Sequence, residues 1–223
     1  MKTKLAAIQL QSKDDLQANL DHCALLLANA AQENVKLAVL PENFAMFAAG
    51  AQLATAKQLP KILTWLSEQA RLHQLWIVAG SVPCLERKNG EMVPDGKVRA
   101  SCFVYNDLGQ QVGRYDKIHL FDVTVADKQA QYQESATFEA GDEVVVIKTP
   151  FANIGLTICY DLRFPQLFQA LRDQGADIIV VPAAFTALTG KAHWQVLLQA
   201  RAIESQCFIV GAGQSGQHSA TRT

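Results

Sequence analysis

The 223-residue sequence predicts an α/β fold, because short apolar stretches with the length of buried strands alternate with amphipathic helical patterns. In the first third of the chain the order is strand, helix, strand, helix, strand, which is typical of sheet strands joined by crossover helices. Hydrophobic residues make up 49% of the chain, enough for a sizeable core. No change in composition marks a linker, so we expect one domain over 1–223.

The first half of the chain supplies the elements of this alternating order. Apolar residues at helical spacing follow the capping candidates Asp14 and Asp15, and a buried apolar stretch stops at Pro41. The expected elements are a strand over 4–10, a helix from about 15, a strand over 35–40, a helix over 59–73 and a strand over 75–82.

The second half begins with a hairpin, so we expect a mixed sheet. Its strands are 98–106 and 111–115, and the preceding loop, 88–96, is rich in turn residues. The segment 117–142 is long and polar, which indicates a functional loop or an unrecognised element. Strands over 144–148 and 154–158, a helix over 164–174, a strand over 178–181, a helix over 190–205 and a strand over 207–211 complete the expected list. No closing element is visible in 213–223.

The charge balance and the cysteines argue against several classes of function, namely binding to nucleic acid or membranes and zinc or redox chemistry. A net charge of −1 provides no electrostatic reason to expect nucleic acid or an anionic membrane as a partner. Five scattered cysteines contain no Cys-x-x-Cys pair, so a zinc or redox motif is poorly supported. The sequence starts without a signal-peptide pattern and has no apolar run long enough to span a bilayer. We therefore expect a cytoplasmic protein.

The segment 153–165, N-I-G-L-T-I-C-Y-D-L-R-F-P, contains the strongest chemical signal. An apolar strand ends on Cys159, and Pro165 suits the first position of a helix. Cys159 thus lies at a strand-to-helix switch, where helix amides favour a thiolate. On its own, Cys159 is better interpreted as a buried small apolar residue. We expect Asp161 and Arg163 to form a structural ion pair here, and we expect Arg201 and Glu204 to form another on the later helix.

Two other segments offer groups that would assist a nucleophile. Glu42 follows a buried strand in L-A-V-L-P-E-N-F, where a carboxylate is either paired or functional, or else lies in a surface loop. Lys117, in Y-D-K-I-H-L-F-D, could stabilise an oxyanion or be a solvated edge lysine. Glu134 lies in the long polar segment and carries no signal alone.

A histidine base is the alternative to a carboxylate base. His119 and His193 are the candidates for a Cys-His hydrolase or transferase. The sequence suggests no orienting acid for either, and we interpret His193 as structural.

Taken together, P-E-N-F, Y-D-K-I-H-L-F-D and G-L-T-I-C-Y-D-L-R-F-P resemble, in order, the three signature blocks of the nitrilase, or carbon-nitrogen hydrolase, superfamily. The resemblance implies a four-layer α-β-β-α sandwich with two mixed β-sheets. It also implies that the chain stops before the C-terminal strands and tail that members usually have. Dimerisation through the helices over 164–174 and 190–205 is implied as well.

The resemblance further implies a cofactor-independent amidase that acts on a small-molecule amide through a thioester. By motif position, Glu42 is the general base, Lys117 the charge stabiliser and Cys159 the nucleophile. Glu134 supports the lysine, and the backbone N–H of Tyr160 completes the oxyanion site. We expect the distal part of the substrate to contact 120–139 and the loop over 185–193, which starts at Phe185.

Within the superfamily, F-T-A-L-T-G-K-A-H-W and the tail G-A-G-Q-S-G-Q-H are most similar to deaminated glutathione amidases. Those enzymes release 2-oxoglutarate and cysteinylglycine. Omega-amidases, which act on 2-oxoglutaramate and 2-oxosuccinamate, share the T-G-x-A-H-W stretch and remain an alternative. A non-catalytic dimeric interaction protein on the same scaffold is the alternative from another class.

Overall fold

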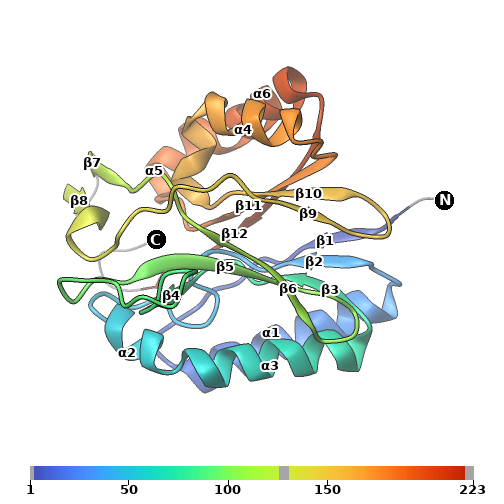
Figure 1. Cartoon of the computed structure of the whole chain (residues 1–223), viewed down its shortest axis with the longest axis horizontal. Coiled ribbons are helices and arrows are strands. Elements are labelled where there is room, and N and C mark those ends of the chain that lie inside the picture. Colours follow the sequence, from blue (N-terminus) through green and yellow to red (C-terminus); the bar gives the residue numbers. More distant parts are fainter. Residues whose placement is uncertain (1–2, 126–130, 219–223) are drawn as a thin grey trace.

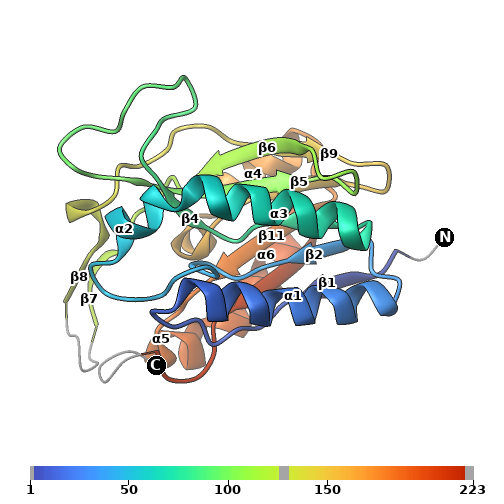
Figure 2. The ribbon, with the colours of Figure 1, turned by 90° about the horizontal axis from the view of Figure 1, so that it is seen from below.

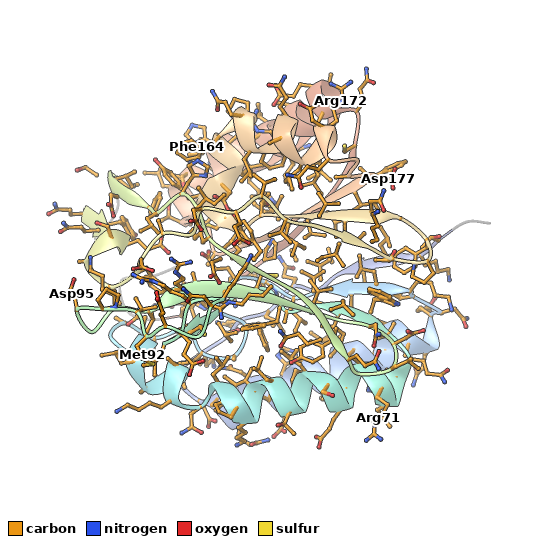
Figure 3. All side chains as sticks on the ribbon, in the orientation of Figure 1. Arg71, Met92, Asp95, Phe164, Arg172 and Asp177 are labelled. Carbon is orange, nitrogen blue, oxygen red and sulfur yellow. The ribbon has the colours of Figure 1, made fainter. Side chains whose placement is uncertain are left out.

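Two β-sheets face each other between two layers of helices, as the sequence resemblance implies (Figure 1). A computed structural model describes residues 3–125 and 131–218. Helices α1 (Leu16–Gln32) and α3 (Leu59–His73) cover the first sheet, and α4 (Pro165–Asp173) and α6 (Gln195–Ser205) cover the second. The labelled side chains Arg71 and Arg172 point away from the two helical layers toward solvent (Figure 3).

The first sheet is mixed. In the described residues its order is β1-β2-β3-β5-β4, with β6 paired to β5. The first three strands are parallel, and the others join antiparallel. The strands are β1 (Leu5–Ala7), β2 (Leu37–Val39), β3 (Trp76–Val78), β4 (Val82–Cys84), β5 (Arg99–Tyr105) and β6 (Gln111–Asp116).

The second sheet has the order β12-β11-β10-β9 and is also mixed. Strands β10, β11 and β12 are parallel, and β9 is antiparallel to β10. The strands are β9 (Val146–Lys148), β10 (Asn153–Leu156), β11 (Ile178–Ala183) and β12 (Phe208–Gly213). These elements match the predicted ones to within a few residues.

The core between the sheets follows from strand alternation. On β2, Leu37 and Val39 pack against Leu156 and Val180 of the other sheet. Ala38, between them, faces the cluster formed with α1 and α3. Because successive side chains of a strand point to opposite faces, one short strand joins two layers of core.

The stretch over 75–82 was predicted as one strand and forms two. Gly80 separates β3 from β4 with a φ of +50°, and a Cβ atom there would lie 1.9 Å from the Pro41 carbonyl oxygen. Only glycine allows this turn and this close approach. A short helix, α2 (Gln52–Lys57), was not predicted, and no side chain caps its start.

The segment over 117–142 also contains elements that the sequence did not indicate. Strands β7 (Asp122–Thr124) and β8 (Gln131–Gln133) form an antiparallel pair, and a 3₁₀ turn, Glu134–Ala136, follows. Both views place this pair at the same end of the molecule as α2 and the short helix α5 (Ala187–Thr189) (Figures 1 and 2).

The helix predicted over 190–205 starts earlier, with α5 and a π-helical turn, Gly190–Trp194, leading into α6. The predicted pair Arg201–Glu204 forms, and Arg201 also donates to the Leu162 carbonyl. The loop 88–96 lies at the surface, where Met92 and Asp95 are seen at the rim (Figure 3). In the part of the chain that the structure describes, no helix has the length and apolar character to cross a membrane.

Candidate active site

A cavity of about 370 Å³ contains all six residues that the sequence predicts for the site. Glu42, Lys117 and Cys159 line it together with Glu134, Tyr160 and Phe185. Its walls come from 43–52, the β8 region, and the segment that follows β11. The strand ends of both sheets meet here, as expected for a site in an α/β fold.

Lys117 lies between two carboxylates. Its Nζ is 3.1 Å from Oε1 of Glu42 and 2.9 Å from each carboxylate oxygen of Glu134. Lys117 is 2% exposed and Glu42 is 5% exposed, so neither is the surface residue that the sequence also allowed. Burial alone lowers the Lys117 pKa, but Glu134 and Glu42 raise it well above its usual value, so the ammonium stays charged.

Glu134 is held in place from a second side. The backbone N–H of Phe121 donates to its Oε2 at 2.6 Å, in addition to the bonds from Lys117. Burial raises the pKa of Glu134, and the Glu42 carboxylate adds to this effect, while Lys117 opposes it. The long polar segment therefore supplies a carboxylate whose main contact is the buried lysine.

Cys159 begins a 3₁₀ turn, Cys159–Arg163, that follows β10 and precedes α4. The predicted strand-to-helix switch is present, although this turn separates Cys159 from the start of α4 at Pro165. Cys159 has a φ of +49°, which a non-glycine residue adopts only when its surroundings impose it. This sharp turn at a strand end brings the thiol to the cavity.

The expectation of a thiolate at Cys159 is wrong for the free protein. Burial raises the Cys159 pKa well above 9.0, and the charge of Glu42 raises it further. Lys117 and the Ala184 amide lower it, but by less. The direction of this pKa shift favours a neutral thiol in the free protein. Its attack on a substrate therefore needs a base.

Glu42 is positioned to receive that proton. The backbone N–H of Ala184, just after β11, donates to its Oε2 at 2.8 Å, while Oε1 faces Lys117. The carboxylate thus contacts Lys117, which follows β6 of the first sheet, and Ala184, which follows β11 of the second.

Asp161 connects the turn of Cys159 to the segment that carries Lys117. It is fully buried and accepts hydrogen bonds from Tyr115 Oη at 2.6 Å and from the Ile158 N–H at 2.8 Å. The backbone N–H and Nδ1 of His119 also donate to it, at 3.0 and 2.7 Å. The predicted ion pair with Arg163 is therefore wrong, because the Asp161 carboxylate points inward to these donors.

The histidines of the alternative hypothesis lie outside the cavity lining. His119 does have an orienting acid, Asp161, contrary to the sequence interpretation, but its ring stacks on Phe164 at 3.6 Å between centroids. His193 Nδ1 lies 3.2 Å from Nη2 of Arg163 and accepts its hydrogen bond. Neither is among the residues that line the cavity, whereas His218 is.

Arg163 and Gln214 are site residues that the sequence interpretation missed. Arg163 lines the cavity, with its guanidinium over the rings of Tyr160 and Phe185 at 5.8 and 5.6 Å. Gln214 Nε2 donates to the Glu42 carbonyl at 3.0 Å and to Ser12 Oγ at 2.8 Å. Gln214 directly follows β12, at the same edge of the sheet as Cys159. This position after a predicted strand was the sequence signal that could have identified Gln214 as a site residue.

Residues of 120–139 and 185–193, the segments expected to contact the substrate, line the cavity. Phe121, Tyr132, Phe138 and Thr189 line the cavity, but residues 126–130 lie outside the described residues. The segment 43–55 forms a further wall that was not predicted.

Comparisons with known proteins agree with this geometry. The carbon-nitrogen hydrolase family model matches residues 4–223. Deaminated glutathione amidase from Yersinia enterocolitica is 41% identical over 98% of this chain and 75% of its own length. The Synechocystis protein of the same name is 43% identical over 96% of this chain and 78% of its own length.

Among solved structures, Saccharomyces cerevisiae Nit3, described as a member of branch 10 of the nitrilase superfamily, has a TM-score of 0.85 and 28% identity. The match covers 99% of this chain and 79% of that one. These relatives favour an amide-hydrolysing enzyme over the non-catalytic interaction protein. The chain belongs to the carbon-nitrogen hydrolase family.

Proposed function

We propose that this protein hydrolyses deaminated glutathione to 2-oxoglutarate and cysteinylglycine, with Cys159 as nucleophile, Glu42 as general base and Lys117 as charge stabiliser. One observation carries the proposal. The Glu42 carboxylate accepts a hydrogen bond from the Lys117 ammonium and lines the same cavity as the Cys159 thiol.

In the first half of the reaction, Glu42 takes the thiol proton as sulfur attacks the amide carbonyl. The C–S bond forms, the C=O π bond opens, and its electron pair becomes the oxyanion of a tetrahedral adduct. This oxyanion lies near Lys117 and, as the resemblance implies, the Tyr160 N–H. Protonated Glu42 then delivers its proton to the leaving nitrogen. The C–N bond breaks, cysteinylglycine leaves, and a 2-oxoglutaryl thioester remains on Cys159.

In the second half, Glu42 removes a proton from water, which attacks the thioester. The C–S bond breaks, 2-oxoglutarate leaves and the thiol is restored with the proton that Glu42 took. No metal or organic cofactor takes part in these steps. Glu134 has a supporting role, because its two contacts at 2.9 Å set the position of the Lys117 ammonium.

Arg163 supports the choice of a 2-oxo acid as the acyl part. Its guanidinium lines the cavity four residues after Cys159, and a planar fork of donors suits a carboxylate. The aromatic rings of Tyr160 and Phe185 hold it there. The two bacterial relatives named deaminated glutathione amidase support cysteinylglycine as the leaving group.

A substrate panel tests the proposal. Purified protein is incubated with deaminated glutathione, 2-oxoglutaramate and N-carbamoyl amines, and each product is quantified, with Cys159→Ala as the control. We expect the highest kcat/KM with deaminated glutathione and no turnover by the variant. Higher kcat/KM with 2-oxoglutaramate would indicate an omega-amidase, and preference for N-carbamoyl amines would contradict both assignments.

We also infer a homodimer formed through α6. Val196 and Ile203 are seven residues apart, so they share one face of the helix, and they are 63% and 78% exposed. Phe208, at the start of β12, is 76% exposed. Ile203→Glu should halve the mass measured by light scattering, whereas Leu72→Glu, at a 70% exposed site on α3, should leave it unchanged.

A cytoplasmic location is the remaining part of the proposal. All five cysteines lie in the described residues, and each is a free thiol. Free cysteines are typical of proteins from a reducing compartment.

A further inference from the structure

The cavity has two unlike walls. Arg163, Tyr160 and Phe185 form a cationic and aromatic wall next to Cys159. A second wall is formed by Asn43, 46–52, Thr55 and His218. The stretch 43–55, N-F-A-M-F-A-A-G-A-Q-L-A-T, contains no Lys, Arg, Asp or Glu.

Apart from His218, the residues of the second wall follow Glu42 closely in the chain. The role of Glu42 therefore indicates which part of the substrate lies next to this wall. Glu42 must lie next to the leaving nitrogen to protonate it. The wall formed by the residues that directly follow Glu42 is therefore available to the substituent that this nitrogen carries. Asn43 is the first of these, and its N–H is held by Ser81 Oγ at 3.1 Å.

We propose that this wall, Asn43 and 46–52 with Thr55 and His218, is the subsite for the leaving amine, and that Phe47 and His218 determine how large an amine the enzyme releases. The proposal rests on the proposed function, because it uses Glu42 as the group that protonates the amine. The ligand it takes is a small amine with an uncharged, polarisable side chain, such as the cysteinyl thiol.

The wall is anchored in the fold. The Phe47 and His218 rings lie 4.4 Å apart between centroids, and the Phe47 N–H donates to the Lys13 carbonyl at 3.0 Å. His218 Nδ1 lies 2.8 Å from the Ser12 carbonyl oxygen and donates to it. Asn19 Nδ2 donates to the Ala45 carbonyl at 2.9 Å.

The chemistry of this wall suits the cysteinyl side chain of cysteinylglycine. Met46 and Phe47 are partly exposed apolar side chains that line the cavity. A thiol makes favourable contacts with an aromatic ring edge or a thioether. Ammonia, released from a primary amide, has no group that reaches this wall. Substrates that share the acyl part and differ in the nitrogen substituent therefore show the contribution of this wall to kcat/KM.

The experiment compares a series of 2-oxoglutaramides that differ only in the nitrogen substituent. The series is the unsubstituted amide, the N-methyl amide, the N-benzyl amide and deaminated glutathione. It is run with the wild type, Phe47→Ala and His218→Ala. Leu53→Ala is the matched control, because Leu53 lies in the same segment, is 43% exposed and is not a lining residue.

We expect Phe47→Ala and His218→Ala to lower kcat/KM for deaminated glutathione about tenfold more than for the unsubstituted amide, since pocket contacts of this kind discriminate substrates by that order. The N-benzyl amide should follow deaminated glutathione, and Leu53→Ala should follow the wild type. Equal losses on all amides, or no loss on any, would overturn the proposal.

The series also separates this proposal from the proposed function. A wild type that cleaves the unsubstituted and N-benzyl amides but not deaminated glutathione would contradict the substrate assignment. The loss of kcat/KM for the N-benzyl amide relative to the unsubstituted amide in Phe47→Ala and His218→Ala would then test the leaving-amine subsite independently. Turnover by Cys159→Ala would contradict the mechanism whatever the substituent.

Discussion

Gln214 donates a hydrogen bond from Nε2 to the backbone carbonyl of Glu42 at 3.0 Å, although the two residues are 172 positions apart. The same Gln214 amide is bound to Ser12, whose hydroxyl donates to the Phe44 carbonyl at 2.9 Å. Ser12 and Gln214 thus hold the backbone at Glu42 and at Phe44, two residues further on. They have no contact with the reacting atoms and act by positioning Glu42.

Gln214→Leu should therefore lower kcat with little change in KM. Losing a hydrogen bond of this kind costs about 1–2 kcal/mol, so we expect a fall of about tenfold. Steady-state kinetics with deaminated glutathione measure it. Gln11→Ala, which removes an exposed bond from Gln11 to the Gln217 carbonyl, is the control. A change in KM alone would contradict a role in positioning the base.

The state of the Cys159 thiol leads to a prediction about alkylation. Because burial and Glu42 raise its pKa well above 9.0, the rate of its reaction with iodoacetamide in the free enzyme should keep rising with pH beyond 9. Peptide mass spectrometry follows the modification of Cys159 separately from the other cysteines. A rate that levels off below pH 7 would mean that the resting residue is a thiolate.

The buried carboxylate of Asp161 should stabilise the fold as well as the turn. Asp161→Asn keeps the size but leaves some of the four donors without an acceptor, so unfolding free energy should fall by about 3 kcal/mol. Urea denaturation measures this loss. Asp173→Asn, at the exposed end of α4, should change it little. Equal stability of the two variants would contradict the role given to Asp161.

The ion pairs of Glu139 predict how stability depends on pH. Hydrogen bonds from Arg87 lower the pKa of this carboxyl, burial raises it, and hydrogen bonds from Arg99 lower it further. The net effect lowers the pKa from 4.5 to about 2. Because the pKa is lower in the folded state, the stabilisation is complete above 4.5 and is lost as pH falls toward 2. Glu139→Gln should flatten the stability curve in this range. An unchanged slope would contradict the assignment.

Much of the fold could be predicted from local patterns. The helix over 59–73 matches α3, because Pro60 marks its first turn and Ile62, Leu66 and Ala70 are buried at helical spacing. The hairpin of β5 and β6 followed from its turn residues. Helix α2 could not be predicted, because it is six residues long and lacks a side-chain cap.

Contacts between distant segments explain what the sequence interpretation missed at the site. The three motifs pointed to Glu42, Lys117 and Cys159, and the structure brings them together. The neutral thiol was not predictable, because it depends on how deeply Cys159 is buried and how near Glu42 lies. Likewise, Asp161 pairs with His119, which is 42 residues away in the chain. Arg163, the partner expected from the sequence, instead lines the cavity.

The central claim is a thioester between the substrate acyl group and Cys159. Wild-type protein turning over deaminated glutathione is quenched in acid, digested and analysed by mass spectrometry. The account predicts a 2-oxoglutaryl group on the Cys159 peptide that hydroxylamine removes, with no adduct and no turnover in Cys159→Ala. Continued hydrolysis by Cys159→Ala, or turnover by the wild type with the acyl group on another residue, would contradict it.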